Sequence, residues 1–196
     1  MSPSLGLSPE STIAPRDFRK VLSHFCTGVV VITAPGPSGA PVGFACQSFA
    51  ALSLEPPLVL FCPVTGSRTG AAIEVAGKFC ANVLTAAQQP VCARFGTREI
   101  EDKFAGTTWR WSGRGLPVLD GALATIECSV VSVADGGDHH IVVGRVDTLS
   151  AAADAGRPLL FYRGRYATIE PADPSLAPWR VDLERFLATT TFDSWL

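Results

Sequence analysis

Residues 122–133, ALATIECSVVSV, alternate between apolar and small or polar side chains over twelve positions. This period is typical of a β-strand that buries one face and exposes the other. The following ADGGDH suits a tight turn because glycine accepts positive φ, and residues 141–146, IVVGRV, predict the returning strand. A long antiparallel hairpin is therefore the element that the sequence predicts most strongly.

Shorter patterns predict the other elements. Apolar and β-branched runs predict strands at 28–33, 42–45, 58–62 and 78–84, two short strands within 158–168, and a weaker one at Trp109 and Trp111. Helices are expected at 15–25, where Phe18, Val21, Leu22 and Phe25 share one face, at 67–76, and as a turn at 88–95. Because helices and strands do not alternate strictly, we predict a fold that is mainly β with inserted helices, a β-barrel.

The domain organisation follows from length and composition. The chain has 196 residues, no internal repeat and no linker that would divide it. We expect a disordered leader at 1–14, which lacks the basic start and apolar stretch of a secretory signal, and a single domain at 15–170. Residues 171–196 are expected to form a C-terminal helical extension, with an amphipathic helix at 179–187, that packs on the domain or on a neighbouring subunit.

Composition excludes several classes of function. A net charge of -2 and a pI near 5.9 give no general attraction to nucleic acid or to an anionic membrane, and no apolar run approaches the ~20 residues of a membrane span. The six cysteines stand mostly in apolar runs without a C-x-x-C pair, which is typical of buried thiols in a reducing cytosol. We expect a cytoplasmic protein without a metal site, since His139 and His140 lack further ligands at the usual spacings.

Several catalytic motifs are absent from the sequence. No G-x-G-x-x-G follows a strand, because Gly113 and Gly115 lack the third glycine and the helix. No Walker loop and no G-x-S-x-G elbow is present, and no cysteine–histidine pair stands out as nucleophile and base. A dinucleotide would therefore not bind in the Rossmann manner.

Three polar segments remain as candidate sites. In PVGFACQSFAALSLEPP, residues 41–57, Gln47 and Ser48 interrupt an apolar run, so they either bond to the protein's own backbone or await a ligand. In PVTGSRTG, residues 63–70, Ser67 is either a plain helix N-cap or part of an anion-binding loop with Arg68. The third segment is GGDHH at 136–140, where a histidine beside a turn is most often solvated.

Taken together, these segments indicate one kind of ligand. An apolar cleft, backbone donors and a nearby anion loop are what a phosphorylated aromatic cofactor requires. The constellation fits the mononucleotide half of a flavin, and composition alone does not distinguish a flavin from other nucleotides.

Five stretches, in order along the chain, carry a resemblance to a known family: FCTGVVVIT, GFACQSFAALSLEPPLVLFCP, KFCANVL, GGDHHIVVGRV and PLLFYRGRY. They are similar to the flavin reductases of two-component flavin-dependent monooxygenases, over about residues 16–170. The resemblance implies an FMN-binding split β-barrel. Within the family, the second stretch and the ending TTTFDSWL are most similar to the reductase of the actinobacterial hydroxylase that acts on a phenolic secosteroid in cholesterol degradation.

The resemblance also implies a flavin site. Gln47 and Ser48 would be left unpaired by the protein, so that the isoalloxazine and ribityl chain complete them. Arg68 and Thr69 would hold the phosphate. The implied flavin residues are Pro41, Val42, Gly43, Phe44, Ala45, Gln47, Ser48, Cys62, Pro63, Val64, Arg68, Thr69, Arg94 and Phe95. Many family members carry Thr-Ala-Asn in place of Ala45-Cys46-Gln47, so one threonine hydroxyl contact is missing here.

The nicotinamide side is implied in the same way. His139 corresponds to the histidine of the family's G-D-H turn and would position the nicotinamide, whereas His140 has no family counterpart. The rest of NADH is expected at Tyr162, Arg163, Gly164 and Arg165. No residue need act as a covalent nucleophile, because hydride passes between the two cofactors.

The expected function is therefore an NADH-dependent flavin reductase that reduces FMN or FAD and supplies reduced flavin to a partner monooxygenase in aromatic or steroid catabolism. Family members are generally homodimers with the flavin site near the subunit interface, so a homodimer is expected. Two alternatives stay open: a non-catalytic flavin-binding protein of the same fold, and an oxidase related to the pyridoxamine-phosphate oxidases. Neither FMN against FAD nor NADH against NADPH is readable from the sequence.

Overall fold

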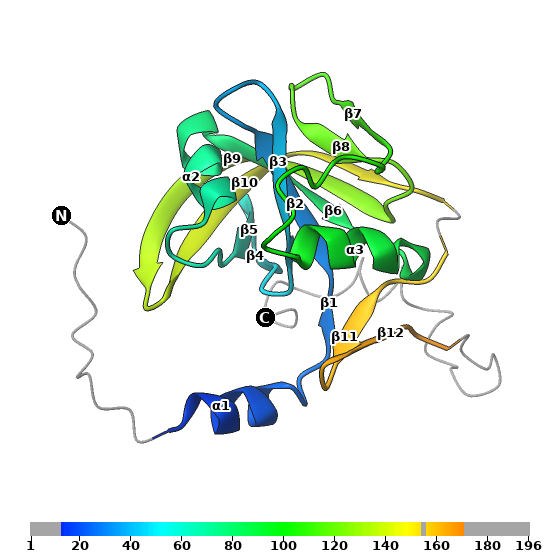
Figure 1. Ribbon diagram of the computed structural model, residues 1–196. Coiled ribbons are helices and arrows are strands. Elements are labelled where there is room, and N and C mark those ends of the chain that lie inside the picture. Colours follow the sequence, from blue (N-terminus) through cyan, green and yellow to red (C-terminus); the bar gives the residue numbers. More distant parts are fainter. Residues whose placement is uncertain (1–12, 154–155, 171–196) are drawn as a thin grey trace.

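A computed structural model describes residues 13–153 and 156–170 (Figure 1). The helices are α1 (Pro15–Leu22), α2 (Arg68–Ala76), α3 (Gln89–Gly96) and the 3₁₀ turn η1 (Ala86–Gln88). The strands are β1 (Thr27–Gly28), β2 (Val30–Pro35), β3 (Pro41–Cys46), β4 (Ala50–Leu54), β5 (Pro57–Phe61), β6 (Lys78–Val83), β7 (Trp109–Trp111), β8 (Pro117–Leu119), β9 (Ala124–Gly136), β10 (His139–Ala151), β11 (Leu160–Tyr162) and β12 (Arg165–Ala167).

The largest sheet has seven antiparallel strands in the order β3-β2-β6-β9-β10-β5-β4. Its edge strands, β3 and β4, follow each other in the chain and are joined by residues 47–49 alone. This connection spans at most about 14 Å, since each extended residue advances by no more than ~3.6 Å. The sheet must therefore curl until its two edges nearly meet. The result is a β-barrel split along one side, which confirms the predicted fold class.

The predicted hairpin is the longest element of the sheet. β9 and β10 pair from His139 and Gly136 at the turn to Ala151 and Ala124 at the far end, with two register shifts. Gly137 in the turn has a φ of 82°, a conformation that glycine adopts without strain. β9 begins at Ala124 rather than at residue 122 but continues to Gly136, because the pairing extends up to a tight turn. β10 runs from His139 to Ala151, because its pairing continues past the register shift after Val146.

Two hydrophobic clusters explain the apolar run in β2. Val30 and Ile32 point into the barrel, where the rings of Phe61 and Phe79 meet edge to face with centroids 4.8 Å apart. Val31, between them, points outward into a second cluster under α3. Because β2 is buried on both faces, its sequence is continuously apolar rather than alternating.

A buried polar network ties β2 to its neighbours. Asn82 on β6, the only asparagine in the chain, is fully buried. Its Nδ2 donates to the Val31 carbonyl at 3.0 Å and to Thr33 Oγ1 at 3.1 Å, and its Oδ1 accepts from the Leu119 backbone N–H at 2.9 Å. Thr33 in turn donates to the Pro117 carbonyl. The side chain of Asn82 therefore joins β6 to both β2 and β8.

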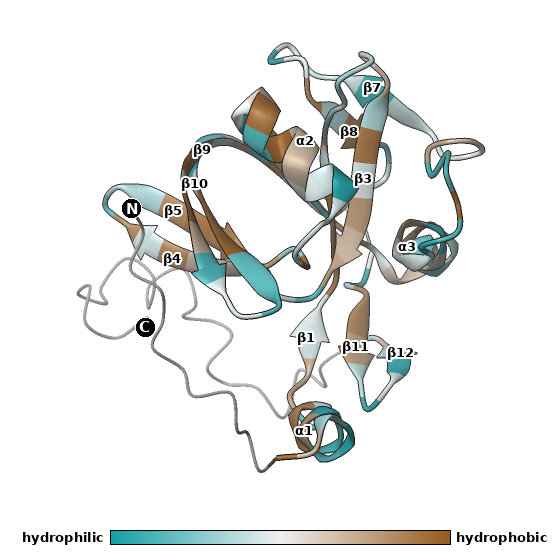
Figure 2. Ribbon diagram, turned by 60° about the vertical axis from the view of Figure 1, so that its left-hand side comes forward, coloured by the Kyte–Doolittle hydropathy of each residue, from teal (hydrophilic) through white to brown (hydrophobic). Residues whose placement is uncertain are grey.

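The first helix stands apart from the barrel. A three-stranded sheet, β1-β11-β12, extends below the body, and α1 projects beyond it (Figure 1). None of the eight residues of α1 is buried. Figure 2 views α1 nearly along its axis, with hydrophobic residues on one side and hydrophilic residues on the other. The exposed fractions of Phe18, Val21, Leu22 and Phe25 are 56%, 65%, 50% and 73%.

Two strands were missed by the sequence analysis. β4 is an edge strand of mixed burial with a register shift, so it lacks the expected alternation. β8 has only three residues, and all of them are buried. The helix predicted at 15–25 ends at Leu22. The leader up to residue 12 and the amphipathic helix predicted at 179–187 lie outside the described residues. No helix among the described residues combines the length and the apolar character needed to cross a membrane.

Replacing Asn82 by alanine is expected to lower the free energy of unfolding by about 2–4 kcal/mol, because the Leu119 N–H and the Val31 carbonyl lose their partner in a buried site. Urea denaturation measures this loss. Gln89→Ala removes an exposed amide from α3 and is the matched control, expected to change stability by less than about 0.5 kcal/mol. Equal stability of the two variants would contradict the role given to Asn82.

Candidate functional site

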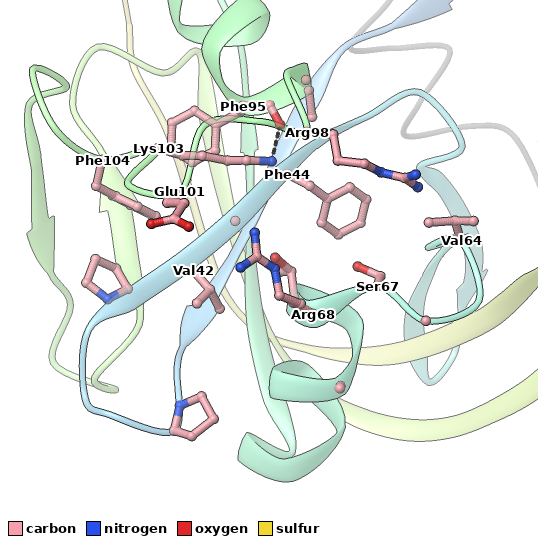
Figure 3. A pocket seen from close by; sticks show the side chains of 18 of the residues that line it. Val42, Phe44, Val64, Ser67, Arg68, Phe95, Arg98, Glu101, Lys103 and Phe104 are labelled. Carbon is pink, nitrogen blue, oxygen red and sulfur yellow. Dashed lines mark hydrogen bonds between the residues drawn. The ribbon is translucent and has the colours of Figure 1, made fainter.

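A cavity of about 990 Å³ lies between β3, the start of α2 and the loop that follows α3. Figure 3 shows side chains from all three segments around it. Nine of the residues that the sequence predicted for flavin line it: Pro41, Val42, Gly43, Phe44, Ala45, Val64, Arg68, Thr69 and Phe95. The cavity therefore gathers residues separated by more than fifty positions in the chain.

Strand β3 forms one wall of this cavity. Gly43 is buried at its centre, and a Cβ there would lie 2.8 Å from Phe95 Cε1 and 2.9 Å from the Ile32 carbonyl oxygen. Only glycine lets α3 bring the Phe95 ring this close to the strand. The wall at this point is consequently main chain and aromatic ring, a surface that suits a flat ligand.

The start of α2 forms the second wall. Ser67 is the N-cap, and its Oγ accepts from the Gly70 N–H at 3.1 Å. The side chain of Arg68 is exposed to the cavity and has no hydrogen-bond or ion-pair partner among the described residues. The plain N-cap and the anion loop, which the sequence left as alternatives, are thus compatible: Ser67 caps the helix while Arg68 remains available to an anion.

The loop after α3 forms the third wall, and the sequence analysis missed it. Lys103 and Arg98 both line the cavity, together with Glu101. Lys103 Nζ donates to the Phe95 carbonyl at 2.9 Å (Figure 3). Burial, and next the positive charge of Arg68, lower the pKa of Lys103 below its ordinary value. No known motif and no clear periodicity marked this loop, although the cluster of charged residues at 98–103, REIEDK, is a signal that could have drawn attention to it.

The prediction that Gln47 and Ser48 are left unpaired by the protein is wrong. Ser48 Oγ accepts from the Cys62 N–H at 2.9 Å and also contacts Cys46 Sγ at 3.2 Å. Gln47 Oε1 accepts from Thr27 Oγ1 at 3.2 Å. Both residues lie in the connection that crosses the split between β3 and β4, so Ser48 joins this connection to the end of β5. Neither residue lines the main cavity.

Three other predicted flavin residues also lie away from the main cavity. Arg94 donates from Nε to the Lys103 carbonyl at 3.0 Å and from Nη2 to the Asp102 carbonyl at 2.8 Å, so its guanidinium braces the loop instead of facing the ligand space. Pro63 lines a smaller neighbouring cavity of about 270 Å³, and Cys62 bonds to Ser48 through its backbone.

The predicted nicotinamide residue His139 lies beside the cavity wall. It forms an isolated antiparallel bridge with Val64, which lines the cavity. The Thr65 N–H donates to the Asp138 carbonyl and the His140 N–H donates to the Pro63 carbonyl, each at 2.9 Å. His139 Nδ1 donates to Asp138 Oδ1 at 2.7 Å, and this hydrogen bond holds the pKa of Asp138 below its usual value.

The other predicted nicotinamide residues, Tyr162, Arg163, Gly164 and Arg165, lie elsewhere. They form the turn between β11 and β12 in the three-stranded sheet, whereas His139 belongs to the seven-stranded sheet. The Arg163 N–H donates to the Ser23 carbonyl just after α1. The structure therefore does not bring this turn and His139 into one cavity within the described residues.

Comparison with known proteins decides the family. A family model described as flavin reductase like domain matches residues 22–170. The chain belongs to this flavin reductase family. The reductase subunit HsaB of a flavin-dependent monooxygenase from Rhodococcus jostii is 59% identical over 97% of this chain and 96% of that protein. The FMN reductase (NADH) SmoA from Agrobacterium fabrum is 43% identical over 77% of this chain and 84% of that protein.

A solved structure supports the same assignment. The crystal structure of a homologue of nitrilotriacetate monooxygenase component B from Mycobacterium thermoresistibile has a TM-score of 0.76 and 58% identity, covering 81% of this chain and 90% of that one. These findings confirm the resemblance found in the sequence and the prediction of an oxidoreductase that reduces flavin.

Gly43→Ala is expected to lower the free energy of unfolding of this flavin reductase by about 1–3 kcal/mol, because the new methyl group collides with Phe95 and the Ile32 carbonyl. It should also weaken flavin binding, since the cavity wall shifts. Thermal denaturation and flavin fluorescence titration measure the two effects. Gly28→Ala, in β1, has no atom within 4 Å of the new Cβ and is the matched control. A Gly43→Ala protein as stable as the control would refute the close packing.

Proposed function

We propose that this flavin reductase binds its flavin in the cavity between β3 and α2, with the isoalloxazine along residues 41–45 and the phosphate at the start of α2. One observation carries the proposal: Arg68 lies at a helix N-terminus, across from the part of β3 that Gly43 keeps free of a side chain. The Arg68 side chain is exposed to the cavity and has no partner among the described residues. A helix N-terminus with a guanidinium favours a phosphate, and a flat wall favours a ring.

The reaction is NADH + oxidised flavin + H⁺ → NAD⁺ + reduced flavin. The flavin supplies the hydride acceptor at N5 when the nicotinamide C4 is stacked about 3–3.5 Å away. The protein's part is to hold both substrates. His139, tied through Val64 to the cavity wall and oriented by Asp138, is placed to position the nicotinamide at that edge. Since Nδ1 donates to Asp138, Nε2 is the atom that His139 presents to a ligand.

The rate of NADH oxidation in the presence of FMN, and then of FAD, tests this function, and parallel assays with NADPH report the preference for nicotinamide. Sustained turnover with flavin in excess supports a reductase that releases reduced flavin. Tight flavin binding without turnover would instead favour the non-catalytic flavin protein. Protection of Arg68 from guanidine-directed modification by FMN would locate the phosphate independently of activity.

His139→Ala is expected to raise KM for NADH and lower kcat, with kcat/KM reduced about 10- to 100-fold, the scale of a lost charged hydrogen bond. Flavin binding should change less than about twofold. His140→Ala is the matched control, because His140 is the next residue and has no proposed role. Its Nδ1 lies 3.6 Å from Asp135 Oδ1. If the two variants behave alike in steady-state kinetics, His139 does not position the nicotinamide.

We further propose that the partner oxygenase acts on a phenolic steroid-derived substrate. The proposal rests on the similarity of GFACQSFAALSLEPPLVLFCP and TTTFDSWL to the secosteroid hydroxylase reductase, and on the extent of the identity to HsaB. The chain is also similar to a homologue of nitrilotriacetate monooxygenase component B, so nitrilotriacetate is the competing substrate. Reconstitution with each type of oxygenase, scored by hydroxylated product per NADH, distinguishes them.

We also propose a cytoplasmic location, where NADH and free thiols persist.

The exposed face of α1 supports a homodimer. Phe18, Val21 and Leu22 form an apolar stripe on a helix with no buried residue, and the exposed Phe25 lies just after it. Such a stripe on a soluble protein marks an interaction surface. We propose that a second copy of the chain covers it. The opposite face carries Arg16 and Lys20, so the helix is amphipathic.

The wild-type protein is expected to have twice the chain mass of 20.7 kDa by light scattering. Phe18→Asp should shift the mass toward that of the monomer, because it places a charge in the stripe, whereas Lys20→Ala on the opposite face should leave the dimer intact. A wild-type monomer at micromolar concentration would show that another part of the chain covers the stripe.

A further inference from the structure

We infer that Lys103 is a second cation for the flavin phosphate, facing Arg68 across the main cavity, and that this pair makes the reductase prefer phosphorylated flavins to riboflavin. The inference rests on the flavin site proposed above and adds a residue that the sequence comparison did not mark. Its experiment separates phosphate recognition from flavin reduction itself.

The two cations come from opposite walls. Arg68 is the first residue of α2, and Lys103 belongs to the loop after α3; both line the main cavity. In the view of Figure 3 the guanidinium of Arg68 and the ammonium of Lys103 lie on either side of β3, with the ammonium directed at the Phe95 carbonyl. Their mutual influence is repulsive, since the charge of Arg68 disfavours the protonated form of Lys103. Two like charges held this way are stabilised when an anion lies between them.

Lys103 is held in place by reciprocal hydrogen bonds. Its Nζ donates to the Phe95 carbonyl at 2.9 Å, while Arg94 donates to the carbonyls of Asp102 and Lys103. Asp102 Oδ1 accepts from the N–H groups of Phe104 and Ala105, both at 3.0 Å, which closes the loop. The ammonium is therefore fixed at the cavity wall, with two of its three N–H donors left for a ligand.

The remaining charges around the cavity favour an anion. Arg98 adds a third cation, and Glu101 is the one carboxylate among the lining residues. No ion pair joins Glu101 to Arg68, Arg98 or Lys103 among the described residues, so it does not neutralise them. A phosphate monoester, which carries about −1.5 to −2 charges at neutral pH, matches two facing cations. Riboflavin has the same ring and ribityl chain but no phosphate, so it isolates this interaction.

Lys103→Met tests the inference through the affinities for FMN and riboflavin, each measured by fluorescence quenching and as KM in NADH oxidation. The Kd for FMN is expected to rise about 10-fold or more, the scale of a hydrogen bond to a charged group, with riboflavin changed less than about twofold. Lys103→Arg should largely restore the preference for FMN. Equal losses for the two flavins, or no loss for FMN, would overturn the inference.

Lys78→Met is the matched control. Lys78 is also half-buried and also donates one hydrogen bond to a backbone carbonyl, that of Arg114 at 2.6 Å, but it does not line the main cavity. It should leave the ratio of the FMN and riboflavin affinities unchanged. A change as large as that of Lys103→Met would mean that the ratio reports general destabilisation, and the inference would fail.

The wild-type protein provides a test that needs no variant. Because the pKa of Lys103 is lowered, the ammonium loses its proton at a lower pH than an ordinary lysine, whereas the facing arginines stay charged. The preference for FMN over riboflavin is expected to fall as the pH is raised through the alkaline range. A constant ratio would overturn the inference, while riboflavin turnover at every pH would leave the reductase activity itself established.

Discussion

The Asn82 side chain is the constraint on which the rest of the structure depends. It is buried between β2, β6 and β8, and its hydrogen bonds fix the position of β2 relative to strands that follow it by more than forty residues. β2 pairs directly with β3, the strand that forms one wall of the main cavity. A single amide in an otherwise apolar interior therefore specifies where the ligand-facing strand lies, because any other arrangement leaves buried donors and acceptors unsatisfied.

The sequence predicted the architecture well where burial of a strand produces a regular pattern of apolar residues. The β9–β10 hairpin and the doubly buried β2 follow from alternation and from continuous apolar character. β4 escaped because an irregular edge strand has no clean period. The closure of the barrel was not visible in any one element; it follows from the short connection at residues 47–49, which becomes informative only when the order of the strands is known.

The site was predicted less completely, for a physical reason. Residues 41–45 and 67–69 lie on elements whose local sequence already specifies their geometry. The partners of Ser48 and the orientation of Lys103 instead depend on contacts formed only after folding, such as the approach of Cys62 to Ser48 across the split. For Ser48 the residues alone left self-pairing and ligand pairing open, and the family resemblance implied ligand pairing. The structure selects self-pairing, because the ends of β3 and β5 lie together there.

The bridge between Val64 and His139 has a consequence for how such reductases diversify. The segment entering α2 and the tip of the long hairpin share backbone hydrogen bonds, so an insertion in either one displaces both. The selectivity for the electron donor and the selectivity for the electron acceptor therefore change together when either segment changes.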